Sequence, residues 1–231
     1  MTVARRACYP DGVDVLRIVR LVLLAPALLA SSGEGRPAGK LLRVGVFLED
    51  YLRESAPGPW QALCPGKDGL ALRTTTVRIT PAPPLHGDEP AKNVDALECP
   101  DALVLMRVGS LRDGQVETVF RGEPRFLSTG ETTLRVGKSR YELEERRDGE
   151  RLAIVLRLDA VEQRVVSLDS CCNDASPMLL WAGDVDRDQK LDLVLDLKTH
   201  YAASRYALFL SSAARSGDLV AEVAHFVSGS C

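Results

Sequence analysis

Residues 132–168 read T-T-L-R-V-G-K-S-R-Y-E-L-E-E-R-R-D-G-E-R-L-A-I-V-L-R-L-D-A-V-E-Q-R-V-V-S-L. Apolar and polar side chains alternate in short runs, which is the period of a strand with one buried face. Gly-Lys-Ser, Asp-Gly and a further tight connection separate these runs. Asp-Gly between two strand patterns is a strong hairpin signal, because both residues tolerate positive φ. The stretch therefore predicts an antiparallel meander with strands over 132–136, 141–146, 151–158 and 161–168.

Similar short runs occur on both sides of this meander. They predict further strands over residues 41–47, 70–79, 102–108, 178–182, 191–197, 206–210 and 219–226. Short strands at intervals of about 8–12 residues are typical of all-β proteins. Residues 80–90 are rich in proline, which cannot donate to a ladder, and this predicts a loop. We expect an all-β fold, as an antiparallel meander, a sandwich, a barrel or a partial propeller-like sheet. No internal repeat supplies the blades of a complete propeller.

The first thirty residues differ from the rest of the chain. Arg5, Arg6, Arg17 and Arg20 accompany an apolar run at 21–30, and small residues follow it. This order is typical of a secretory signal peptide, and the run is too short to span a bilayer. A buried N-terminal helix is the alternative. We expect a signal peptide at 1–30 and a flexible linker at 31–39. A 40–128 N-terminal β region and a 129–231 C-terminal β region then follow, as one domain or two. The mature chain has no predicted membrane span, and the expected location is secreted or periplasmic.

Export would place the cysteines in an oxidising compartment, where they become disulfide candidates. Five lie beyond the signal segment, at Cys64, Cys99, Cys171, Cys172 and Cys231. Cys64 and Cys99 are each followed by proline and form a plausible pair. Adjacent Cys171 and Cys172 are too close for an ordinary bridge. The full connectivity cannot be deduced from the sequence.

The composition excludes some classes of partner. The net charge is −3, and acidic residues are interspersed among the arginines. Nucleic-acid binding needs a clustered basic surface, so no nucleic-acid partner is expected. Aromatic residues make up only 5% of the chain. This argues against a sugar-stacking or base-stacking surface.

One stretch carries recognisable chemistry. Residues 181–197 read W-A-G-D-V-D-R-D-Q-K-L-D-L-V-L-D-L. Asp184, Asp186 and Asp188 alternate in a tight loop, and the carbonyl of Lys190 and the carboxylate of Asp192 can join them. Such a set of hard oxygens, completed by water, is what Ca²⁺ prefers. The leucines at 191–197 recur with period two, so the loop leads into a strand. We therefore predict one Ca²⁺ site in a β-loop-β setting.

An EF-hand is excluded, because its sixth and twelfth places would hold Gln189 and Leu195 instead of Gly and Glu. The segment instead resembles the calcium loop of FG-GAP (VCBS-type) repeats, which form the blades of integrin-α-like propellers. Gly183 and the alternating aspartates match the family opening, and residues 191–194 match its Asp-Leu strand. The resemblance covers about 17 residues in a single copy. Gln189 stands where the family usually has Gly, which would weaken the site if that place needs a left-handed backbone.

The remaining histidines, serines, glutamates and tryptophans are expected to have structural or surface roles rather than to form a site. His86, His200 and His225 lack metal or triad spacing, and Ser211-Ser212 lacks a hydrolase elbow. The glutamates at 142, 144 and 145 are expected to be compensated by Arg146 and Arg147. Trp60 and Trp181 are expected to anchor the core. The aspartates at 184–192 could also lie on a solvated turn and bind nothing.

The expected function is an exported calcium-binding β protein that acts as a binding or structural module without catalysis. The expected partner is an unidentified protein or surface ligand, and the oligomeric state stays open. The first alternative is a secreted hydrolase-type enzyme whose catalytic loops carry no recognisable motif. The second is a fragmentary propeller blade that completes its sheet by self-association.

Overall fold

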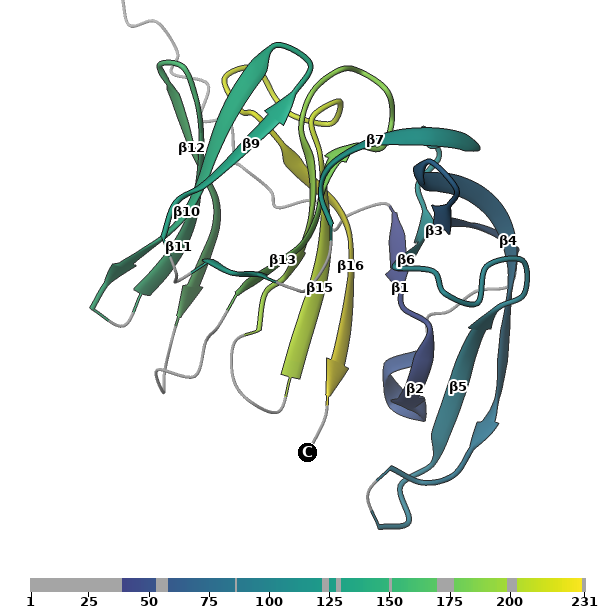
Figure 1. Ribbon diagram of the computed structural model, residues 1–231. Helices are drawn as coiled ribbons and strands as arrows, with labels where there is room; N and C mark the ends of the chain where they lie inside the picture. Colours follow the sequence, from purple (N-terminus) through teal and green to yellow (C-terminus); the bar gives the residue numbers. More distant parts are fainter. Residues whose placement is uncertain are drawn as a thin grey trace, which may run out of the picture. The chain divides into compact units, whose positions relative to one another are not determined.

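The computed structural model describes residues 39–52, 58–85, 87–121, 125–127, 130–149, 151–169, 177–198 and 203–229 (Figure 1). The predicted signal peptide at 1–30 lies outside the described residues, as do Cys171, Cys172, Cys231 and nearly all of the predicted linker. The predicted all-β fold is confirmed. One short 3-10 helix, η1 (Glu49–Leu52), accompanies the strands. No helix in the described part of the chain is long and apolar enough to cross a membrane.

The strands are β1 (Lys40–Leu42), β2 (Gly45–Leu48), β3 (Pro59–Gly66), β4 (Gly69–Ala82), β5 (Ala91–Ala96), β6 (Val104–Arg107), β7 (Gly114–Phe120), β8 (Arg125–Phe126), β9 (Thr132–Val136), β10 (Ser139–Asp148), β11 (Arg151–Leu158), β12 (Val161–Asp169), β13 (Met178–Asp184), β14 (Asp192–Asp196), β15 (Ala203–Leu210) and β16 (Ala221–Gly229).

Twelve strands form a nearly closed, barrel-like antiparallel sheet in the order β1-β6-β3-β4-β7-β13-β14-β15-β16, with β2, β5 and β8 paired beside this path. The first and last strands of the path approach each other. The backbone N–H of Gly39, just before β1, donates to the carbonyl of Val223 in β16 at 3.0 Å. The ring of Phe47 in β2 meets the ring of Phe226 edge-on, with centroids 5.1 Å apart. A backbone hydrogen bond and a ring contact therefore link β16 to the first strands of the described chain.

The remaining four strands form the predicted meander as a separate sheet in the order β12-β11-β10-β9. Gly137 and Gly149 lie in its tight turns with φ of 54° and 60°. These are left-handed conformations, which glycine adopts without steric cost. In Figure 1 the sheet stands beside β13 and β15. The strands predicted at 132–136 and 151–158 match β9 and β11 in full.

Two hydrophobic clusters share the strands β13–β15 as a common layer. Leu193 and Leu195 of β14 and Phe209 of β15 belong to the cluster that also contains Leu143 and Ile154 of the four-stranded sheet. Side chains of successive strand residues point to opposite faces. Val194 and Leu208 accordingly belong to the other cluster, together with Trp60 and Leu105. The predicted regions 40–128 and 129–231 thus contribute side chains to one core.

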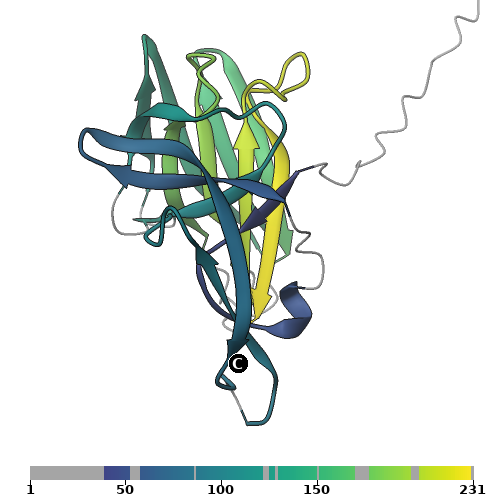
Figure 2. The same cartoon turned by 90° about the vertical axis from the view of Figure 1, so that its right-hand side faces the viewer.

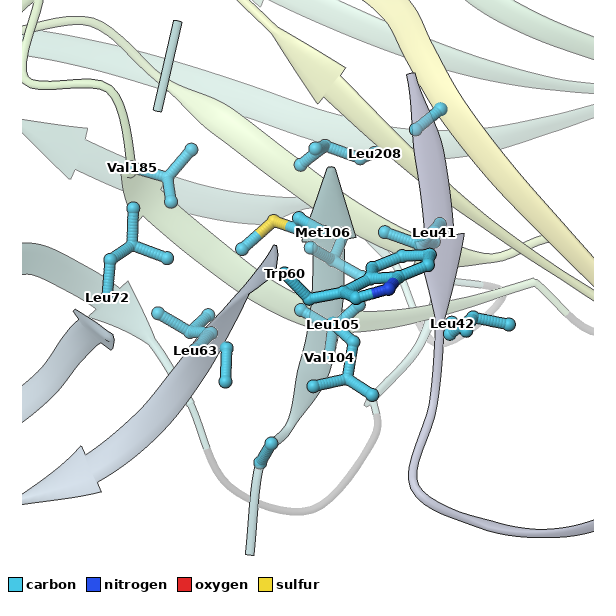
Figure 3. Packing of buried hydrophobic residues seen from close by; sticks show 14 of the residues in the cluster. Leu41, Leu42, Trp60, Leu63, Leu72, Val104, Leu105, Met106, Val185 and Leu208 are labelled. Atoms are coloured by element: carbon cyan, nitrogen blue, oxygen red, sulfur yellow. The ribbon is translucent and has the colours of Figure 1, made fainter. Parts of the chain in front are cut away.

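Figure 3 shows the inside of this second cluster, where the Trp60 ring lies among Leu41, Met106 and Leu105. Trp60 and Trp181 are only 2% and 0% exposed, so both are core anchors as predicted. The predicted disulfide is also present. Cys64 of β3 bonds to Cys99, in the turn after β5, with the two Cα atoms 6.0 Å apart.

Several predictions of local structure are wrong in detail. Residues 80–82, predicted as loop, continue β4, and Pro81 pairs with Lys92 of β5 (Figure 2). This end of β4 has a partner on one side only, where a missing N–H is tolerated. The predicted strand at 41–47 is divided, because Gly45 has a φ of 130° and the chain changes partner from β6 to β5 there. The strands β3, β5, β7 and β8 were not predicted.

Asp196 of β14 is a buried carboxylate on the face that looks into the Trp60 cluster. It is 3% exposed; Oδ2 accepts a hydrogen bond from the Ser204 hydroxyl at 3.2 Å. Its Oδ1 is buried with no hydrogen-bond partner among the described residues. Burial raises the pKa of Asp196, while the bond from Ser204 and the charges of Arg43 and Lys198 oppose this effect.

A raised pKa in the folded state means that the folded protein binds more protons than the unfolded chain. The unfolding free energy therefore decreases as the pH rises from the ordinary carboxyl value of 3.8 through the raised one. We expect Asp196→Asn to abolish this decrease of the unfolding free energy, because asparagine does not titrate. The melting temperature of the variant should exceed that of the wild type most at pH 8, and the difference should shrink towards pH 4. A difference that is independent of pH would contradict the assignment.

Candidate metal centre

The loop between β13 and β14 brings three of the predicted ligands together. Carboxylate oxygens of Asp184, Asp186 and Asp188 all lie within 4.8 Å of one another, so this group could hold a metal ion. Asp184 ends β13 and is 5% exposed, whereas Asp186 and Asp188 are half-buried. The group thus has one carboxylate fixed in the core and two that reach towards solvent.

The backbone wraps around the carboxylate of Asp184. Its Oδ1 accepts a hydrogen bond from the N–H of Asp188 at 3.0 Å, and its Oδ2 accepts one from Gln189 at 2.8 Å. Arg187 and Gln189 have φ of 66° and 64°, which turns these N–H groups inwards. Gln189 therefore does occupy a left-handed position, where a side chain costs about 1 kcal/mol.

Asp192, another predicted ligand, is 0% exposed at the start of β14 and is engaged on both oxygens. Its Oδ2 accepts from the N–H of Val185 at 2.8 Å, and its Oδ1 accepts from the N–H of Ser211 at 2.9 Å. Burial raises the pKa of Asp192 to about 7, and the charge of Asp186 adds to this. The carboxylate closes the loop in this structure. Its role as a ligand stays a prediction, as does that of the Lys190 carbonyl.

Ser211 and Ser212 both contact the loop, although their sequence context does not indicate a site. The Ser211 hydroxyl lies 3.0 and 2.9 Å from the two oxygens of Asp188 and 3.1 Å from Oδ1 of Asp192. The Ser212 hydroxyl donates to Oδ2 of Asp186. Antiparallel pairing of Leu193 with Phe209 brings the end of β15 beside the start of β14. Both serines could have been placed beside the loop only if this register had been known, and no local sequence pattern indicates it.

Arg187 attaches the loop to the start of β7 and to the connection before it. Its Nε donates to the carbonyl of Gln115 at 3.2 Å, and its Nη2 donates to the carbonyl of Arg112 at 3.0 Å. Gly114 has a φ of 137°, and a Cβ there would lie 2.5 Å from Nη2 of Arg187. The backbone conformation therefore favours glycine, and a larger residue would also have to displace the guanidinium of Arg187.

Tyr141 of β10 approaches the same loop from the four-stranded sheet. Tyr141 is 3% exposed, and its hydroxyl lies beside the backbone of Leu191. Burial raises the pKa of Tyr141, and the negative charges of Asp188 and Asp192 add to this effect. The loop is thus a meeting point of both sheets and of the connections before β7 and after β15.

The donor set fits a hard divalent cation. All three grouped ligands are carboxylates, with no histidine or cysteine among them. Burial raises the pKa of Asp184, and the negative charge of Asp188 raises it further. A cation placed among these groups would offset the repulsion that they exert on one another.

The predicted charge compensation is confirmed for two of the three glutamates. Glu144 and Glu145 form ion pairs with Arg146 and Arg147, whereas Glu142 pairs with Arg140 and Arg157 instead. His225 lies 2.8 Å from Glu222 on its own strand. His86 and His200 lie outside the described residues.

Comparisons with known proteins give no family. No protein-family model matches the chain. Neither the curated proteins nor the solved structures contain a match.

Gln189→Gly should relieve the left-handed strain in the loop. Part of this stabilisation is offset, because glycine has a larger conformational entropy than glutamine in the unfolded chain. We expect the unfolding free energy to rise by up to about 1 kcal/mol. Gln189→Ala is the matched control, because it removes the same side chain and keeps the strain. An equal gain from alanine, measured by urea unfolding, would show that the side chain and not the backbone is responsible.

Gly183→Ala should disrupt the entry to the loop. A Cβ at this place would lie 2.0 Å from the carbonyl oxygen of Glu117 and 2.5 Å from Cζ2 of Trp181. Both neighbours are fixed, one in β7 and one in the core, so we expect a loss of about 1–3 kcal/mol or more. Gly109→Ala is the control, since a Cβ there meets nothing within 4 Å. Comparable melting temperatures for the two variants would refute this account.

Proposed function

We propose that this chain is an exported calcium-binding β protein that acts as a binding or structural module, with Ca²⁺ pinning the 184–192 loop. The observation that carries the proposal is the convergence of Asp184, Asp186 and Asp188 within 4.8 Å. Like charges at this separation repel, and a bound cation converts that repulsion into attraction.

Calcium is favoured over other cations by ligand type and by the form of the loop. Ca²⁺ accepts six to eight oxygens in a flexible arrangement, whereas Mg²⁺ demands a stricter octahedron. The proposed set is Asp184, Asp186, Asp188, the Lys190 carbonyl and Asp192, with water completing the shell. We further propose that the loop is of the FG-GAP type, present once, with Gln189 lowering its affinity.

A structural role follows from what the loop touches. Arg187 binds it to the connection before β7, and the two serines at 211 and 212 bind it to the connection after β15. Tyr141 contacts it from the other sheet. A cation supplies positive charge at this junction. The aspartates would hold it there and so fix the loops that surround it, which leaves the nearby surface preorganised for a partner.

Export is supported by the disulfide between Cys64 and Cys99. Such bonds form and persist in oxidising compartments and are rare in the cytosol. The predicted signal segment at 1–30 points in the same direction. We therefore propose a secreted or periplasmic location.

The test is thermal unfolding of the oxidised protein with Ca²⁺, with Mg²⁺ and with excess chelator. Ligand at about 100 times its Kd adds about 2.7 kcal/mol to the native state. For a domain of this size, that raises the melting temperature by roughly 5–11 °C. We expect this rise with Ca²⁺, a smaller one with Mg²⁺, and neither in Asp186→Ala.

Asp88→Ala is the matched control, because it removes one exposed aspartate from the turn between β4 and β5. This variant should respond to Ca²⁺ as the wild type does. No response to Ca²⁺ in the wild type, or an equal loss of response in both variants, would overturn the calcium proposal.

A further inference from the structure

The connection between β15 and β16 is fixed at both of its ends. At the first end, Ser211 is only 6% exposed, and its N–H donates to Oδ1 of Asp192 at 2.9 Å. At the other end, the N–H of Val220 donates to Oε1 of Gln163 in β12 at 2.9 Å. Residues 212–218 lie between these two points and are mostly exposed. They form a surface segment, the 212–218 segment, that is anchored on both sides.

One side-chain hydrogen bond links the 212–218 segment to the rest of the described chain. The hydroxyl of Ser212, an exposed residue, donates to Oδ2 of Asp186 in the candidate metal centre. Two backbone hydrogen bonds, of 3.0 and 2.9 Å, close turns at 211–214 and 215–218. They join neighbouring residues of the same connection. The position of the segment relative to the core therefore depends on where the Asp186 carboxylate lies.

The carboxylates of the metal centre differ in how firmly they are held. Asp184 and Asp192 are almost fully buried, and both oxygens of each accept hydrogen bonds from backbone N–H groups. Asp186 and Asp188 are half-buried and reach towards solvent. Ionised carboxylates as close as those of Asp184, Asp186 and Asp188 repel one another, and the outer two are free to move apart. A cation at the centre offsets this repulsion and keeps Asp186 within reach of Ser212.

We propose that the cation regulates the 212–218 segment: bound Ca²⁺ orders it through the hydrogen bond between Asp186 and Ser212, and loss of the ion releases it. This inference rests on the proposed calcium site and gives that site an effect on an exposed part of the surface. Coupling between two sites is reciprocal, so the ordered segment strengthens cation binding by the same factor. Such couplings change an affinity by about 5–150-fold. One hydrogen bond at an exposed residue places this coupling at the lower end of that range.

The test combines hydrogen–deuterium exchange with calorimetric titration of the oxidised full chain with CaCl₂. On saturation with Ca²⁺, we expect the backbone amides of the 212–218 segment to exchange about fivefold or more slowly. The amides of residues 87–89, in the exposed turn between β4 and β5, are the internal control. Their exchange rate should not change, because this turn makes no contact with the metal centre.

Three substitutions at exposed positions isolate the hydroxyl. Ser212→Ala should abolish most of the slower exchange and weaken Ca²⁺ binding about fivefold. Ser212→Thr keeps a hydroxyl at the same place and should retain both properties. Ser216→Ala is the matched control, since it removes an exposed serine of the same segment that does not bond to the metal centre, and it should behave as the wild type.

The two measurements separate this coupling from the calcium site itself. If the wild type binds Ca²⁺ but the 212–218 segment exchanges at an unchanged or faster rate, the coupling is refuted and the calcium site stands. The same conclusion follows if Ser212→Ala binds Ca²⁺ and slows exchange as the wild type does. If the wild type binds no Ca²⁺, the proposed calcium site is refuted, and the coupling with it.

Discussion

Burial of β13–β15 on both faces is the constraint on which the rest of this structure depends. One face packs against the four-stranded sheet, and the other packs inside the barrel-like sheet. A strand in this position pays for every unsatisfied polar side chain, since an unpaired buried donor or acceptor costs about 1–3 kcal/mol. The aspartates of this layer accordingly bond to backbone or hydroxyl groups nearby, as Asp192 does to Val185 and Ser211, and Oδ1 of Asp196 is an exception among the described residues.

The acidic loop is located where this layer ends. There the start of β7 and the connection after β15 converge with Tyr141 of the second sheet, so the loop is near elements of both sheets. Buried hydrogen bonds position Asp184 and Asp192, while Asp186 and Asp188 remain in reach of solvent. Rigid inner groups and accessible outer groups are what a structural cation site requires.

The sequence predicts the meander at 132–168 well, because its alternation and its glycine turns are local signals. It also predicts the aspartate loop and the Cys64–Cys99 bond. It does not predict β3, where prolines and a cysteine obscure the pattern, or the contacts of Ser211 and Ser212, which depend on the register of β14 with β15. The alternating leucines of 191–197 indicate one apolar face. The structure shows that Asp192, Val194 and Asp196 on the other face are buried as well, and this follows from tertiary packing that no local pattern encodes.

The position of β13–β16 in the chain has a consequence for how the protein is made. Strands β1, β3 and β6 are synthesised first, yet the cluster that they enclose is completed by Trp181, Leu208 and Phe226 near the other end of the chain. Until the ribosome has finished, these early strands expose apolar surface that has no partner. Chains that emerge residue by residue, or cross a membrane before folding, would need chaperone protection over that interval. A truncation before β16 would leave the same surface uncovered for good.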